Sequence, residues 1–135
     1  MTMRPVPTPD FTTAPYWEHA KAHEFWLPKC RACGHFHFYP RTICPFCGSD
    51  RIEWRQASGR GSIYTFTLVQ RAPSPAFEPL VPYAVAAITL DEGPHLMSNV
   101  VNCDVDQIRI GSRVAVRYLD IDPDCSLPIF ELDAT

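Results

Sequence analysis

The stretch CRACGHFHFYPRTICPFCG, residues 30–48, contains two CxxCG pairs with ten residues between them. A CxxC pair turns tightly and presents two sulfur atoms to one ion, and four thiolates complete a tetrahedral zinc shell. A complete shell has no open position for water or substrate. We therefore predict that a structural zinc ion, one per chain, is bound by Cys30, Cys33, Cys44 and Cys47.

The four cysteines are compatible with other chemistry besides zinc binding. Iron in a rubredoxin-type site would use the same four ligands and stays open. A thioredoxin-like redox pair needs one CxxC in a βαβ pattern, which the sequence does not show. A disulfide framework conflicts with the cytoplasmic location that we expect from the lack of a secretory signal and of a long apolar run.

The remaining metal-binding residue types are expected to have no ligand role. His35 and His37 flank the site, but four cysteines already suffice for one ion. Cys103 and Cys125 lack CxxC spacing and are expected to be ordinary strand or loop residues. The sequence contains no GxSxG, HExxH, P-loop or GxGxxG motif, so we expect no catalytic residue on this chain.

Composition and charge are those of a globular protein with two unlike halves. The chain has 135 residues, of which 46% are hydrophobic and 20% are charged. Residues 1–60 hold eight Lys and Arg against five Asp and Glu, whereas residues 61–135 hold four against ten. An acidic second half is unfavourable for a protein that binds nucleic acid through that half.

The N-terminal region predicts one short helix. Residues 1–10 hold three prolines and are expected to form a flexible arm. After Thr13, a residue typical of helix starts, a helix is predicted over residues 14–23. Tyr16 and Trp17 lie on it, and two roles stay open for this helix: packing on the rest of the protein, or docking on a partner.

The rest of the chain predicts a small barrel. Runs of β-branched and aromatic residues predict strands at residues 51–56, 62–70, 83–90, 95–101, 113–120 and 127–133. A proline-rich extended loop is expected at 71–82, and a short helical turn at 104–111 that ends at Gly111. The last five strands, with this helical turn between the third and the fourth, favour a closed barrel of the OB type.

These elements together predict a mainly β fold in three parts. Residues 1–28 form the N-terminal arm and helix, residues 29–50 form a rubredoxin-like zinc ribbon, and residues 51–135 form a five-stranded OB-fold domain.

The order of these parts resembles a known family. The segments that carry the resemblance are PYWEHA (15–20), the CxxCG pairs with YPR (39–41), GRGSIYTFT (59–67), PYAVAAITLDEGPHLMSNVV (82–101) and IRIGSRV (108–114). On these segments the chain resembles the acyl-CoA-associated zinc-ribbon/OB-fold proteins of bacteria and archaea, over about residues 11–132.

The resemblance implies a partner. Members of this family are non-catalytic companions of thiolase-like enzymes, including lipid-transfer-protein-type thiolases and steroid side-chain aldolases. It implies a heterotetramer of two large and two small chains, with a CoA thioester as the ligand of the complex. Thiolytic and retro-aldol cleavage both stay open, because the reacting residues belong to the large chain.

A set of exposed-type residues is the candidate contact surface for the partner or for CoA. Zinc with four thiolates carries a net negative charge, so the basic residues beside the cysteines either offset it or bind phosphate groups of a ligand. The candidate contact residues are Tyr16, Trp17, Lys29, Arg31, Arg41, Arg60 and Arg71.

Two other functions are compatible with an OB-type barrel. A single-stranded nucleic-acid binder would use an aromatic platform on the barrel, for which Tyr64 and Phe66 are the candidates. An acyl-CoA-binding module that acts without a partner is the other alternative.

Overall fold

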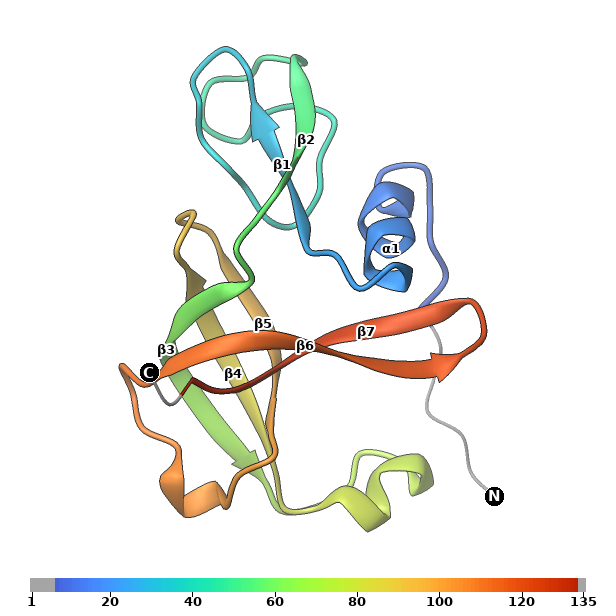
Figure 1. Cartoon of the computed structure of the whole chain (residues 1–135), viewed down its shortest axis with the longest axis vertical. Helices are drawn as coiled ribbons and strands as arrows, with labels where there is room; N and C mark the ends of the chain where they lie inside the picture. Colours follow the sequence, from blue (N-terminus) through green and yellow to red (C-terminus); the bar gives the residue numbers. More distant parts are fainter. Residues whose placement is uncertain (1–6, 134–135) are drawn as a thin grey trace.

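The cysteine-containing ribbon, residues 26–56, lies on one end of a closed barrel, and a short helix lies beside the ribbon (Figure 1). The structure is a computed structural model and describes residues 7–133, so the first six residues of the expected arm lie outside it. Helix α1 spans Ala14–Lys21, and the ribbon sheet pairs β1 (Trp26–Cys30) with β2 (Ile52–Gln56). The predicted fold, mainly β with a ribbon and an OB-type barrel, is confirmed.

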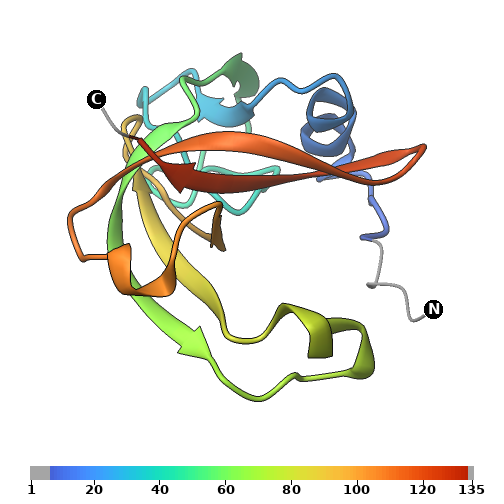
Figure 2. The same cartoon turned by 60° about the horizontal axis from the view of Figure 1, so that its bottom comes forward.

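The barrel has five strands in the order β3-β4-β5-β7-β6. Their bounds are Arg60–Val69 for β3, Tyr83–Leu90 for β4, His95–Val101 for β5, Arg113–Asp122 for β6 and Cys125–Leu132 for β7. All neighbours are antiparallel except β5 and β7, which pair in parallel at Val100 with Phe130 and at Val101 with Glu131. The parallel contact is therefore short, and the β6–β7 hairpin extends beyond it towards α1 (Figure 2).

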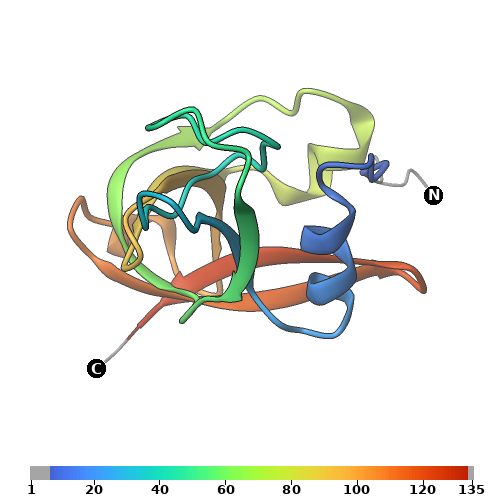
Figure 3. The same cartoon turned by 90° about the horizontal axis from the view of Figure 1, so that it is seen from above.

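Strand β2 belongs to the ribbon sheet and not to the barrel. It falls within residues 51–135, which the sequence pattern assigned to the OB domain, but its partner across five residue pairs is β1. Cys30 faces Ile52 in this register, so the strand returns directly from the second cysteine knuckle to the first. Seen from above, the ribbon loops cover one end of the barrel (Figure 3).

Helix α1 ends two residues earlier than predicted. His23 has a φ of 60°, a left-handed value that no α-helix can continue through. Its N–H bonds to the carbonyl of Ala20, and the N–H of Glu24 bonds to the carbonyl of His19. These two bonds form a Schellman motif with a histidine where glycine is usual.

Asp10 organises the turn before α1. Its carboxylate accepts hydrogen bonds from the N–H groups of Thr12 and Thr13 and from the hydroxyl of Thr13. The Thr13 side chain therefore bonds to Asp10 and makes no capping bond to the helix.

The two predicted connections contain short 3₁₀ helices. The proline-rich loop forms η1 over Pro75–Leu80, because a proline suits the first position of such a turn. The helical turn η2 spans only Val105–Gln107 and does not reach Gly111. It stops because Ile108 is extended, with its side chain buried among the barrel core residues.

One continuous core joins the three parts. Tyr16 of α1 packs its ring edge on to Phe25, with ring centroids 6.1 Å apart. Phe25 in turn meets Phe130 of β7 edge-on at 6.2 Å. Because Phe130 lies at the centre of the barrel core, the helix and the ribbon are anchored to the barrel through aromatic contacts.

Gly59 lies where the chain passes from the ribbon to the barrel. Its φ is +74°, and a Cβ added there would lie 2.3 Å from the Val116 Cγ1 atom on β6. Its carbonyl also accepts a 2.7 Å hydrogen bond from the Val116 N–H. The backbone at this junction therefore needs a residue without a side chain.

We predict that Gly59→Ala lowers the free energy of unfolding by about 2–4 kcal/mol, since it adds backbone strain and overpacking at Val116. Gly111→Ala is the matched control, because its φ is +91° but an added Cβ meets nothing within 4 Å. Urea unfolding of both variants measures the difference. Equal losses in the two variants would show that the contact with Val116 contributes nothing.

Candidate functional site

The four cysteines of the ribbon come together as two equivalent knuckles. In the first, the N–H of Gly34 bonds to the carbonyl of Cys30 at 2.8 Å, and in the second the N–H of Gly48 bonds to the carbonyl of Cys44 at 2.9 Å. The sulfur atoms of all four cysteines lie within 4.8 Å of one another. The predicted ligand residues therefore form one cluster.

The spacing of the sulfur atoms fits tetrahedral coordination of one metal ion. The Sγ atoms of Cys30 and Cys47 are 3.6 Å apart, as are those of Cys33 and Cys44. Four thiolates at zinc–sulfur bonds of 2.3 Å would place neighbouring sulfurs about 3.8 Å apart. The donor set and its size therefore suit zinc, and iron would use the same four sulfurs.

Backbone groups prepare the sulfur atoms for a cation. The N–H groups of Cys33 and Ala32 lower the pKa of the Cys30 thiol to about 6. For Cys33 the N–H of His35 lowers the thiol pKa, but burial and the neighbouring sulfur atoms outweigh it and raise the pKa to about 12. Without a cation the four sulfurs thus cannot all be thiolates, so metal binding must displace protons.

The two histidines of the ribbon differ in their surroundings. The ring Nδ1 of His35 lies 3.3 Å from the Cys33 sulfur, and the ring stacks on Phe46. His37 is buried, and within residues 7–133 neither of its ring nitrogens has a hydrogen-bond partner. Burial lowers the pKa of His37, which favours the neutral ring.

We predict that Cys30→Ser loses the metal and strongly destabilises the ribbon, because structural zinc contributes roughly 10–16 kcal/mol of apparent binding energy in finger peptides. Elemental analysis should give one zinc per wild-type chain and none in the variant, and the variant should melt at a lower temperature. Cys103→Ser is the control, since Cys103 lies outside the sulfur cluster. Stoichiometric zinc and unchanged melting in Cys30→Ser would refute the ligand assignment.

The five basic candidate contact residues do not form one patch. Arg31 lies 4.0 Å from Glu53, and Arg60 lies 3.8 Å from Asp133, so both already face carboxylates. Arg60 begins β3 and Arg71 lies two residues beyond its end, and a strand of that length spans roughly 30 Å. One group of phosphates therefore cannot contact both arginines.

Two basic residues remain close to the metal site. The Lys29 ammonium lies 5.4 Å from the centre of the Phe36 ring, in a cation–π contact. Arg41 is exposed and lies between the two cysteine pairs, close enough to His37 to affect its pKa. Both are placed to offset the negative charge of a metal with four thiolates.

The two aromatic candidates on α1 have different positions. Tyr16 is only 8% exposed and belongs to the core, where burial raises its pKa. Trp17 is partly buried and lines an apolar groove of about 600 Å³ between α1, the ribbon loop and the barrel. Tyr39 of the ribbon and Met97 of β5 line the same groove and are exposed.

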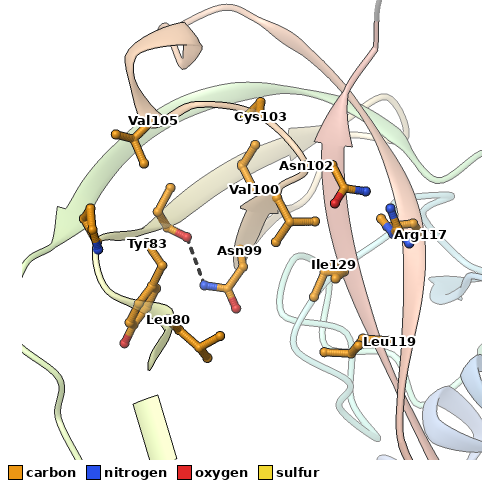
Figure 4. A pocket seen from close by; sticks show the side chains of 13 residues that line it. Leu80, Tyr83, Asn99, Val100, Asn102, Cys103, Val105, Arg117, Leu119 and Ile129 are labelled. Atoms are coloured by element: carbon orange, nitrogen blue, oxygen red, sulfur yellow. Dashed lines mark hydrogen bonds between the residues drawn. The ribbon is translucent and has the colours of Figure 1, made fainter. Parts of the chain in front are cut away.

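A second cavity adjoins the groove, shares Asn99 and Ile129 with it, and extends towards η1. It has a volume of about 360 Å³ and is lined by residues of β4, β5, β6, β7 and η1, including Ala84 and Asn99 (Figure 4). The sequence pattern named neither cavity. In the sequence, the relevant residues are a methionine on β5 and alanines on β4. The direction in which their side chains point follows only from the register of the barrel strands.

Comparison with known proteins identifies the family. The description "ChsH2, rubredoxin-like zinc ribbon domain" matches residues 17–53, and "ChsH2, C-terminal OB-fold domain" matches residues 54–119. A DUF35 domain-containing scaffold protein of Pyrococcus furiosus is 38% identical over 100 residues, which cover 73% of this chain and 72% of that protein.

The chain belongs to the ChsH2/DUF35 family of zinc-ribbon and OB-fold proteins.

A solved structure shares the whole architecture. The structure titled "Ltp2-ChsH2(DUF35) aldolase" contains a chain that superposes with a TM-score of 0.84 at 35% sequence identity, covering 93% of this chain and 98% of that one. The family resemblance inferred from the sequence is therefore confirmed.

A longer relative contains an equivalent segment. The probable enoyl-CoA hydratase alpha subunit of Thermomonospora curvata is 36% identical over 128 residues, which cover 95% of this chain but only 40% of that protein. This member of the ChsH2/DUF35 family thus spans less than half the length of that hydratase subunit. Among the described residues no helix is long and apolar enough to span a membrane.

Proposed function

We propose that this chain is the non-catalytic zinc-containing subunit of a thiolase-like enzyme complex that acts on acyl-CoA thioesters. The larger partner supplies the reacting residues, and this chain supports assembly and the CoA-substrate site. The observation that carries the proposal is the superposition, over nearly all of both chains, on a chain of the Ltp2-ChsH2(DUF35) aldolase. We expect the complex to contain two large and two small chains and to be cytoplasmic.

The apolar groove supports a contact with the larger chain. Tyr39 and Met97 are exposed in it, and Trp17 forms part of its wall. Aromatic residues and methionine are enriched in protein interfaces, and exposed apolar surface of this kind marks an interaction site. We propose that the catalytic chain covers this groove.

The basic residues of the ribbon support a role near CoA. Lys29 and Arg41 lie beside the metal site and are exposed or partly exposed. We propose that they face the CoA phosphates in the assembled complex, while Arg31, Arg60 and Arg71 contribute less because of their carboxylate partners or their distance. We include steroid and other lipid side chains among the acyl groups.

We predict that co-expression with a neighbouring thiolase-like gene yields a complex that elutes as one peak in size-exclusion chromatography at micromolar concentration. Assays of the complex with acyl-CoA, with and without free CoA, separate thiolysis from retro-aldol cleavage, because only thiolysis consumes CoA. Separate elution, with each chain stable alone, would refute the proposed partner.

The groove has its own test. Met97→Glu should weaken the complex at least about tenfold, since it places a charge in a desolvated interface. Met97 is 73% exposed in the isolated chain, so the fold should tolerate the change. Ile110→Glu is the matched control, because Ile110 is 68% exposed and does not line the groove. An intact complex with Met97→Glu would place the contact elsewhere.

The nucleic-acid alternative depends on Tyr64. This side chain is 60% exposed on β3 and contacts the ring of His95, whereas Phe66 packs against the core. Residues 61–135 carry four Lys and Arg against ten Asp and Glu, which repels phosphates. We predict no binding to oligo-dT at physiological salt by fluorescence anisotropy, and tight, salt-sensitive binding would reverse this ranking.

A further inference from the structure

The barrel has an open end opposite the ribbon. There, η1, the start of β4 and the end of β5 face the β6–β7 hairpin across a pocket of about 360 Å³ (Figure 4). This volume is within the range of small-molecule sites.

The sequence of β4 explains why the pocket is open. The inward-facing residues of this strand are Ala84, Ala86, Ile88 and Leu90. Ile88 and Leu90 fill the barrel towards the ribbon, Ala86 is buried in the core, and Ala84 lines the pocket. Small barrels are normally filled by their own side chains, so small residues at one end leave space for a ligand.

The walls of the pocket are mainly apolar, and Arg117 is the one charged side chain among the described residues that line it. Val100, Leu119 and Ile129 provide hydrocarbon surface. Arg117 also lines the pocket, but its guanidinium lies 3.4 Å from the Glu131 carboxylate. Burial raises the pKa of Cys103, the pocket's thiol, which keeps it protonated. An anionic ligand would have to compete with Glu131, so an uncharged ligand is favoured.

Two asparagines line the pocket, and one of them, Asn102, donates its Nδ2 hydrogen to the Glu131 carboxylate at 3.3 Å. The Asn99 Nδ2 atom donates a 2.9 Å hydrogen bond to the carbonyl of Ala84. Because a carbonyl is only an acceptor, this bond fixes which end of the amide is nitrogen. In Figure 4 the Asn99 oxygen points into the space between Leu80 and Ile129. A ligand seated there is therefore met by an acceptor and must supply a donor.

We infer that the open end of the barrel binds a small uncharged hydrocarbon that carries a hydroxyl group, with the hydrocarbon on Val100, Leu119 and Ile129 and the hydroxyl donating to the Asn99 oxygen.

Three six-membered-ring probes test this inference on the full zinc-loaded chain. Cyclohexanol supplies the donor, methoxycyclohexane lacks it, and cyclohexanecarboxylate carries a charge. In methyl-detected NMR titrations, cyclohexanol should shift the methyl signals of Ala84, Val100 and Leu119 and should bind about tenfold more tightly than either of the other two probes.

Variants separate the pocket from the groove and from general packing. Ala84→Leu should fill the pocket and abolish saturable binding. Ala87→Leu is the matched control, since Ala87 lies on the same strand but lines the groove. Asn99→Ala should still bind cyclohexanol and should bind methoxycyclohexane equally well, a loss of discrimination that a merely structural role of Asn99 would not produce.

Each contrary outcome overturns the inference. Shifts confined to Met97 and Ala87 would place binding in the groove. Cyclohexanecarboxylate binding as tightly as cyclohexanol would refute the uncharged class. Unchanged preference for the alcohol in Asn99→Ala would refute the hydrogen bond, and binding that survives in a folded Ala84→Leu variant would refute the pocket.

Discussion

The four sulfur atoms of the ribbon are the constraint on which its structure depends. The ribbon contains one two-stranded sheet, and most of its residues between β1 and β2 are loop. A two-stranded sheet is at best marginally stable alone. Four thiolates around one ion would hold both knuckles together, and the loop that carries Tyr39 would then have a defined place beside α1 and the barrel.

The barrel depends on a different contact, the parallel pairing of β5 and β7. Only two residue pairs close the barrel there, beside the buried Phe130. The short contact lets the strands diverge on both sides. One side opens towards α1 and the ribbon and forms the groove, and the other opens towards η1 and forms the pocket. Two adjoining cavities, which share Asn99 and Ile129 as walls, therefore follow from one feature of the topology.

Local chemistry explains which elements were predictable. Strands β4 and β5 have the predicted bounds, because clear turn residues separate them. The predicted end of α1 was wrong, because a histidine with a left-handed backbone conformation, where glycine is usual, gives no sequence signal. The helical turn before β6 was also shorter than predicted, because Ile108 leaves the helical conformation to enter the core. Both errors come from tertiary packing that overrides local preference.

The sequence by itself determined the metal ligands that we propose, the mainly β fold and the family, because cysteine spacing and strand patterns are local. Only the tertiary structure decided that Tyr16 is a core residue, that the basic residues are dispersed, and that Met97 and Asn99 line cavities. These properties depend on which strands are neighbours and on the direction of each side chain. Contacts between residues far apart in the chain determine the strand neighbours and the side-chain directions. No local sequence pattern therefore predicts these properties.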